Sequence, residues 1–185
     1  MRFEINYIFV SFVKKQIVYP DFIPRVFAMT IDIAILLYVW VFITPVLNIA
    51  THQVFVYIFQ DFFLLYSIDM SDAKAVAATI YHPAFSEYVS APKFLAYFGY
   101  LLFVNTVFLG SYFITFWYKF GATPGKMAMK MKIVDANDYS KPPLCNLVKR
   151  FFGYITALIG MWSILFSRRG IALHDKIANT VVIKS

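Results

Sequence analysis

Two charged residues, Arg25 and Asp32, lie in the first long apolar stretch of the chain, which reads IPRVFAMTIDIAILLYVWVFI. No charged residue follows Asp32 until Asp61. A carboxylate this deep in a membrane helix costs about 2.5–3.5 kcal/mol on insertion scales, so it must face protein or water rather than lipid. Two roles fit it: a titrating carboxylate of ion-coupled transport that Arg25 tunes, or a polar contact that fixes helix packing.

The spacing of these two residues restricts how they can interact. Arg25 and Asp32 are seven residues apart, so on a helix they share one face, with a rise of roughly 10.5 Å between their Cα atoms. That rise is too long for an easy salt bridge within one straight helix. Each residue is therefore expected to find a partner on another element, or to share a water-filled pocket with the other.

The segment Gly121-Ala-Thr-Pro-Gly-Lys126 resembles a phosphate-binding loop. It has three residues between its glycines, and Met127 stands where Mg²⁺ chemistry needs serine or threonine. It also follows an apolar helix rather than a strand. We therefore expect a tight turn, in which Gly121 caps the helix, Pro124 stops it and Lys126 contacts lipid phosphates or a helix C-terminus. The expected turn and headgroup-contact residues are Gly121, Thr123, Pro124, Gly125 and Lys126.

The pair His174-Asp175 raises the possibility of acid–base chemistry. Adjacent residues on a helix point about 100° apart, so these two do not form an oriented dyad, and no nucleophile motif accompanies them. Asp175 is instead expected to pair with an arginine, Arg25 or Arg150, or to cap a helix.

Other chemistry finds little support in the residue types present. The single Cys145 excludes an intramolecular disulfide and a cysteine metal cluster, and the three histidines are scattered. No catalytic residues, metal site or cofactor are expected, and the protein is not expected to be an enzyme.

The composition predicts the elements that must position these residues. Hydrophobic residues make up 61% of the 185, charged residues only 15%, and the mean hydropathy is +0.67. Soluble domains are about 45–50% apolar, so we expect one integral membrane domain over residues 1–185. Apolar windows at 22–49, 94–118 and 151–167 are the expected spans, and the third is short enough to be re-entrant. The run 54–68 is expected to form an outer-side amphipathic helix, or to continue the first helix beyond a kink at Pro45.

Basic residues are distributed unevenly between the connecting segments. Residues 119–150 carry seven basic and two acidic residues, whereas 50–93 carry two basic and four acidic. The positive-inside rule therefore places the N-terminus and the 119–150 loop in the cytoplasm and 50–93 outside. Three full spans would put the basic tail outside as well. However, 129–135 and 180–184 both resemble short strands, and their pairing as a hairpin-like element would keep the tail cytoplasmic, which is the interpretation we favour.

The combined pattern resembles the RDD family of small membrane proteins. The residues that carry the resemblance are Arg25 and Asp32, the turn at 121–126, the segment MKMKIVDANDYSKP, Arg150 and the segment LHDKIANTVVI. The family takes its name from one arginine and two aspartates; Arg25 and Asp32 match the first two, and Asp175 is assigned as the second aspartate. The resemblance covers about residues 20–184, and the chain departs from the family pattern in its long 50–93 loop and at Met127.

The resemblance implies a multi-span protein, mostly of bacterial inner membranes, with cation/proton antiport proposed for some members and auxiliary or assembly roles for others. Two functions follow. One is a small ion-coupled transporter or transport-associated component using Asp32 and Arg25. The other is a non-enzymatic scaffold, assembly factor or accessory subunit whose charged residues fix helix packing. The expected partners are the bilayer, anionic lipid headgroups, and copies of the chain or subunits of a membrane complex, with no nucleic acid.

Overall fold

The computed structural model describes residues 18–154 and 171–185. Its chain forms two compact units, residues 1–32 with 113–185, and residues 33–112. We call them the first unit and the second unit and describe each by itself.

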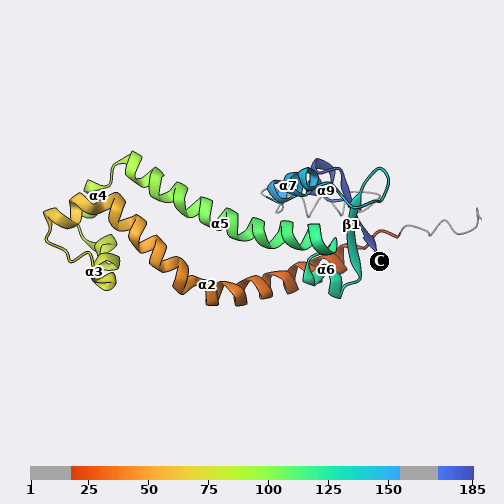
Figure 1. Cartoon of the computed structure of the whole chain (residues 1–185), viewed down its shortest axis with the longest axis horizontal. Coiled ribbons are helices and arrows are strands. Elements are labelled where there is room, and N and C mark those ends of the chain that lie inside the picture. The colour runs from red at the N-terminus through yellow and green to blue at the C-terminus, as the bar shows by residue number, and fades with distance from the viewer. Residues whose placement is uncertain (1–17, 155–170) are drawn as a thin grey trace, which may run out of the picture. The chain divides into compact units, whose positions relative to one another are not determined.

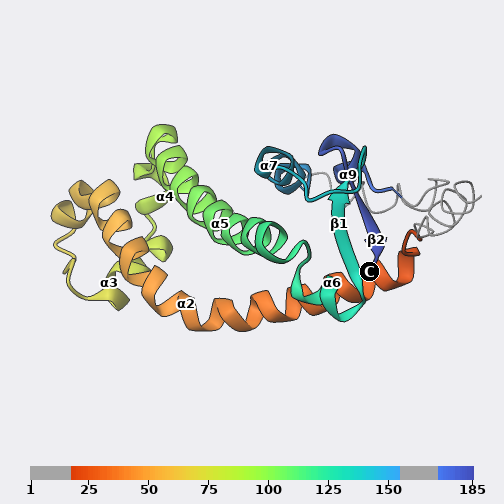
Figure 2. The same cartoon turned by 45° about the vertical axis from the view of Figure 1, so that its right-hand side comes forward.

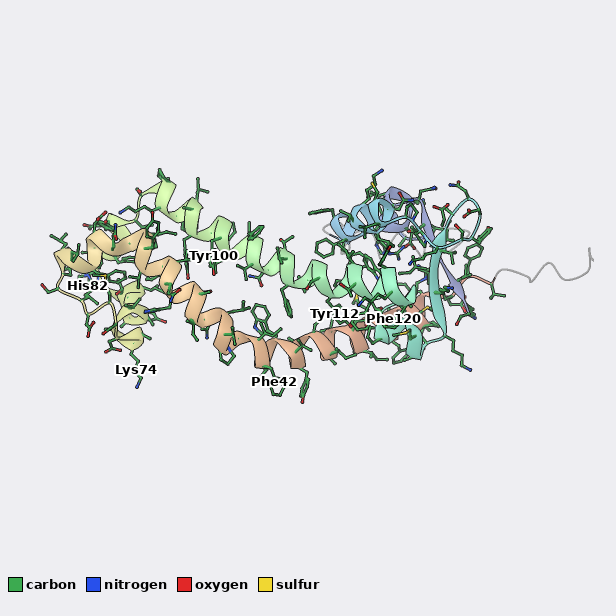
Figure 3. All side chains as sticks on the ribbon, viewed as in Figure 1. Phe42, Lys74, His82, Tyr100, Tyr112 and Phe120 are labelled. Carbon is green, nitrogen blue, oxygen red and sulfur yellow. The ribbon has the colours of Figure 1, made fainter. Side chains whose placement is uncertain are left out.

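Two long apolar helices dominate the chain, α2 (Phe22–Leu65) and α5 (Ala91–Phe120) (Figure 1). Each is long and apolar enough to cross a membrane. Only 11% of the most apolar window of α2 and 6% of that of α5 are buried, unlike the core helices of soluble proteins. Phe42, for example, projects from α2 with 64% of its surface exposed (Figure 3). The windows expected at 22–49 and 94–118 are therefore confirmed as candidate spans, whereas most of the window at 151–167 lies outside the described residues.

The apolar run beginning at Val54 is not a separate outer helix. Residues 54–65 continue α2, which passes through Pro45 and has its non-helical backbone angles at Phe59. Helix continuation was the second of the two expected interpretations, but the irregular residue lies more than a dozen positions beyond the expected proline. Phe59 and Phe55 are buried in the aromatic cluster of the second unit, so the irregular turn of α2 lies within a packed part of the helix.

In the second unit, three short elements connect α2 to α5 along the chain. They are α3 (Ala73–Ala78), η1 (Thr79–Tyr81) and α4 (Phe85–Tyr88). Asp72 caps α3 by accepting a hydrogen bond from the Lys74 backbone N–H at 2.8 Å. The core of the unit is aromatic and consists of Phe55, Phe59, Phe62, Phe63, Val76 and Phe85.

The first unit adds a small α/β module to the ends of the long helices. Strand β1 (Met131–Asp135) pairs antiparallel with β2 (Thr180–Lys184), with Met131 opposite Lys184 and Asp135 opposite Thr180 (Figure 2). This confirms the pairing expected from the sequence. Three short helices accompany the strands: α6 (Pro124–Ala128), α7 (Leu144–Gly153) and α9 (Leu173–Ile177).

The core of the first unit joins helix ends to strands. Its buried residues are Ala28, Trp117, Met131, Ile133, Leu147 and Val182. Helix α7 buries Leu147, Arg150 and Gly153, which are spaced three residues apart and therefore lie on one face. This face meets α9, since a Cβ atom at Gly153 would lie 3.0 Å from the Cβ of His174.

Candidate functional site

Asp32 is bound by the glycine-containing turn that follows α5. Its Oδ2 accepts a hydrogen bond from the Thr123 hydroxyl at 2.6 Å, and its Oδ1 accepts one from the Gly125 backbone N–H at 2.8 Å. The carboxylate is only 3% exposed. It lies at the start of α6, where the free N–H groups of a helix favour a negative charge.

The turn is shaped for this approach. Gly121 has φ +71°, in the left-handed region that favours glycine and typically ends a helix. Thr123 is extended and precedes α6, and Pro124 occupies the first turn of that helix rather than only stopping the previous one. A side chain at Gly125 would overlap the Ala28 backbone and lie 3.0 Å from the Asp32 carboxyl carbon. Glycine at this position therefore lets α2 and α6 come into contact.

Asp175 lies between two arginines from different elements. Its Oδ2 is 3.1 Å from Nη1 of Arg25, and its Oδ1 is 2.5 Å from Nη2 of Arg150. The contact with Arg150 is a close ion pair rather than an aligned hydrogen bond. Asp175 Oδ2 also accepts the Ala172 backbone N–H at 3.3 Å, which closes the first turn of α9.

The same network reaches the sheet and the turn. Arg150 Nη1 donates to the Thr180 hydroxyl at 2.6 Å, and thereby connects α7 to β2. The guanidinium of Arg150 also lies over the Trp117 ring, 5.4 Å from its centroid. Side-chain exposure is 8% for Arg25 and 0% for both Arg150 and Asp175. The buried ion pairs therefore join the start of α2 to α7, α9 and β2.

Comparison with known proteins identifies the family of this chain. The model of the RDD family matches residues 19–179, which include both aspartates and both arginines of the site. The chain belongs to the RDD family. It is also 42% identical over 175 residues to an uncharacterized protein from Rickettsia prowazekii (strain Madrid E), an alignment that covers 93% of this chain and 99% of that protein. No solved structure matches the chain.

In this RDD-family protein, Asp175 contacts two arginines and Asp32 binds the turn before α6. Asp175 was expected to pair with Arg25 or Arg150, or to cap a helix; it contacts both arginines and also accepts the Ala172 backbone N–H at the start of α9. Asp32 is held by the turn, through the Thr123 hydroxyl and the Gly125 backbone N–H. Lys126 donates to the Tyr154 hydroxyl at 3.4 Å, while its contact with lipid headgroups stays a prediction.

Three contributors to the site carried no signal in the sequence. Thr180 looks like an ordinary strand residue, and Trp117 and Tyr154 look like lipid-facing aromatics. Their roles depend on where Arg150 and Lys126 come to lie, so local pattern could not identify them. Among the described residues, no group of three or more His, Cys, Asp or Glu side chains could hold a metal ion.

Burial and charge shift the proton affinities of the two α9 residues. Burial alone would raise the pKa of Asp175, but the charges of Arg150 and Arg25, with the hydrogen bond from Arg25, outweigh it and hold that pKa below its ordinary value. Burial lowers the pKa of His174 to about 3, and Arg150, Lys126 and Arg25 add to the effect while Asp175 opposes it. At neutral pH the site therefore contains an ionised Asp175 beside a neutral His174.

The buried His174 predicts a loss of stability in mild acid. Its pKa in the folded protein is about 3, below the ordinary 6.5, so the unfolded chain binds the extra proton first. The penalty is absent above pH 6.5 and grows as the pH falls towards 4, by at most about 1.4 kcal/mol per pH unit. Unfolding in mild detergent, measured from pH 7 to 4, should show a steeper loss for wild type than for His174→Gln. Parallel curves for the two proteins would contradict the assignment.

Proposed function

We propose that this protein is a non-enzymatic scaffold or accessory component of a membrane, in which the family's charged residues hold a small folded module against the ends of the spanning helices. The observation that supports this most directly is the binding of Asp32, whose two oxygens are used by Thr123 and Gly125. A carboxylate held by a hydroxyl and a backbone N–H in a 3% exposed position suits a packing contact better than a carrier that must exchange protons with water.

The polar residues of the spanning helices also favour this proposal. Asn105 donates to the Leu101 carbonyl at 2.8 Å, and Thr44 donates to the Trp40 carbonyl at 2.6 Å. Each of these side chains donates a hydrogen bond to a backbone carbonyl of its own helix, as Ser, Thr and Asn often do. This hydrogen bonding does not require an aqueous path. A translocation path would be better supported by polar groups that face each other across helices.

We further propose that the first unit lies on the cytoplasmic side of a bacterial inner membrane. Its described residues include ten basic and five acidic side chains, whereas the second unit has two basic and four acidic. The positive-inside rule favours the more basic unit in the cytoplasm. Because β2 pairs with β1, the C-terminal strand lies on the same side as the segment that follows α5.

The alternative is an ion-coupled transporter in which Asp32 titrates. The depth of Asp32 in an apolar helix is the observation in its favour. With two candidate spans in the described residues, such a transporter would enclose a path by oligomerising or by joining a larger complex.

A flux assay distinguishes the two functions. Wild type and Asp32→Asn would be reconstituted in liposomes, and proton and cation flux measured under a pH gradient. The scaffold proposal expects both proteins to match empty liposomes, and expects gentle solubilisation to recover a stoichiometric complex. Flux through wild type that a folded Asp32→Asn variant has lost would reject the proposal in favour of transport.

A further inference from the structure

A surplus of positive charge surrounds the α9 site. Arg25 and Arg150 both contact the single carboxylate of Asp175. A third cation, Lys126, donates to the hydroxyl of Tyr154, whose ring lies against His174. Asp32, another buried acid of the first unit, accepts two hydrogen bonds from the turn. Buried charge is costly unless it is balanced, so this cluster is suited to receive an anion.

Buried donors and acceptors in the same cluster have no hydrogen-bond partner among the described residues. They are Nε of Arg150, Nε1 of Trp117 and Nδ1 of His174, and also Nη2 of Arg150 and Oδ1 of Asp175, which form an ion pair with each other. The buried nitrogens of native proteins are nearly always satisfied, so unsatisfied ones call for an explanation such as a bound ion or ligand. Since Arg150 and Trp117 stack on each other, two of these donors belong to one compact pair.

Tyr154 connects these buried groups to the surface. Its ring meets Trp117 edge-on at 5.4 Å and His174 edge-on at 4.5 Å, and its hydroxyl accepts from Lys126 Nζ at 3.4 Å. Lys126 is only half-buried, unlike the arginines behind it. It therefore places an ammonium at the accessible edge of a buried, positively charged cluster of side chains.

We propose that Lys126 and Tyr154, backed by Arg150 and Trp117, bind a phosphate group at this edge of the first unit. A phosphate carries the charge and the several acceptor oxygens that this set of donors lacks. Lys126 follows the apolar helix α5 by only six residues, so a lipid headgroup phosphate is within reach if that helix spans the bilayer. Inorganic phosphate offers the same chemistry, and the experiment distinguishes the two sources.

Trp117 provides a direct readout of binding. The full chain contains three tryptophans, so replacing Trp40 and Trp162 with phenylalanine leaves Trp117 as the single reporter. Its fluorescence would be titrated in mild detergent with phosphatidylglycerol, with phosphatidylcholine and with sodium phosphate. We expect saturable binding of phosphatidylglycerol at least tenfold tighter than that of phosphatidylcholine. Competition by sodium phosphate would assign the site to phosphate in general, and its absence would assign the site to the anionic lipid.

Matched lysine variants test whether the site itself is responsible. Lys126→Gln should weaken phosphatidylglycerol binding about tenfold, and Tyr154→Phe should weaken it a few-fold by removing the hydroxyl next to Lys126. Lys149→Gln is the control, because Lys149 is exposed and immediately precedes Arg150 on α7. It removes the same charge and should change the affinity less than twofold. Equal affinities for the two lipids, or equal losses in the two lysine variants, would overturn the proposal.

Discussion

Replacing Asp175 with asparagine is expected to destabilise the protein by about 3–5 kcal/mol, the usual cost of removing one partner from a buried ion pair. Asparagine has nearly the same shape but no charge, so Arg25 and Arg150 would stay buried at 8% and 0% side-chain exposure without their counter-ion. The expected result is a large drop in the midpoint of unfolding in mild detergent, together with poor accumulation in the membrane.

The control for this substitution is Asp138→Asn, the same change at an exposed position of the first unit. Asp138 accepts the Ser140 backbone N–H at 3.0 Å, which asparagine can also do, so an effect below about 0.5 kcal/mol is expected. Adding Arg150→Gln to Asp175→Asn should cost less than the sum of the two single changes, because one unpaired charge disappears. Additive losses, or a fully stable Asp175→Asn protein, would contradict the buried-pair account.

Replacing Asp32 with alanine is expected to cost about 3 kcal/mol, since it removes two charge-assisted hydrogen bonds and leaves the Thr123 hydroxyl and the Gly125 N–H buried. Asp32→Asn should cost less, because its carbonyl oxygen can still accept one of the two hydrogen bonds. Thermal unfolding in detergent, followed by circular dichroism, measures both changes.

Asp61→Ala provides the comparison within the same helix. Asp61 has a salt bridge to Lys93 at 3.3 Å, but its side chain is 68% exposed. Exposed pairs contribute about 0–1 kcal/mol, so this variant should remain close to wild type. If Asp32→Ala were as mild as Asp61→Ala, the carboxylate would not be holding α2 to the turn, and the transport interpretation of Asp32 would gain support.

In this RDD-family protein, contacts of Asp32 and of Asp175 both attach the small module of the first unit to α2. Asp32 binds the turn before α6, and Asp175 binds the start of α2 and α7. Both attachments use residues from α2 near its N-terminal end, which explains why charged residues are tolerated in an otherwise apolar helix. A scaffold needs this rigidity, and a phosphate site at its edge would orient it on the membrane surface.

Several features were predictable from the residues because they depend on local pattern. The length and apolarity of α2 and α5 could be predicted because a helix that crosses a bilayer needs about 20 apolar residues, with its backbone N–H and C=O groups hydrogen-bonded within the helix. The turn at Gly121 follows from glycine's access to positive φ, and the β1–β2 pair follows from two short runs of strand-forming residues. The expected kink at Pro45 stays a prediction: α2 continues through Pro45, and its non-helical backbone angles lie at Phe59, within the aromatic cluster.

The partners of the charged residues could not be determined from the sequence alone. The apolar residues around Asp32 indicated that it needed a partner. Its donors, the Thr123 hydroxyl and the Gly125 N–H, lie 91 and 93 residues further along the chain. Arg25 and Asp175 are separated by 150 residues, and Arg150 and Thr180 by 30. A buried charge requires compensation wherever it lies, so its need for a partner is evident from the sequence. Which of several chemically suitable groups satisfies it depends on which helices and strands pack together, and only the tertiary structure contains that information.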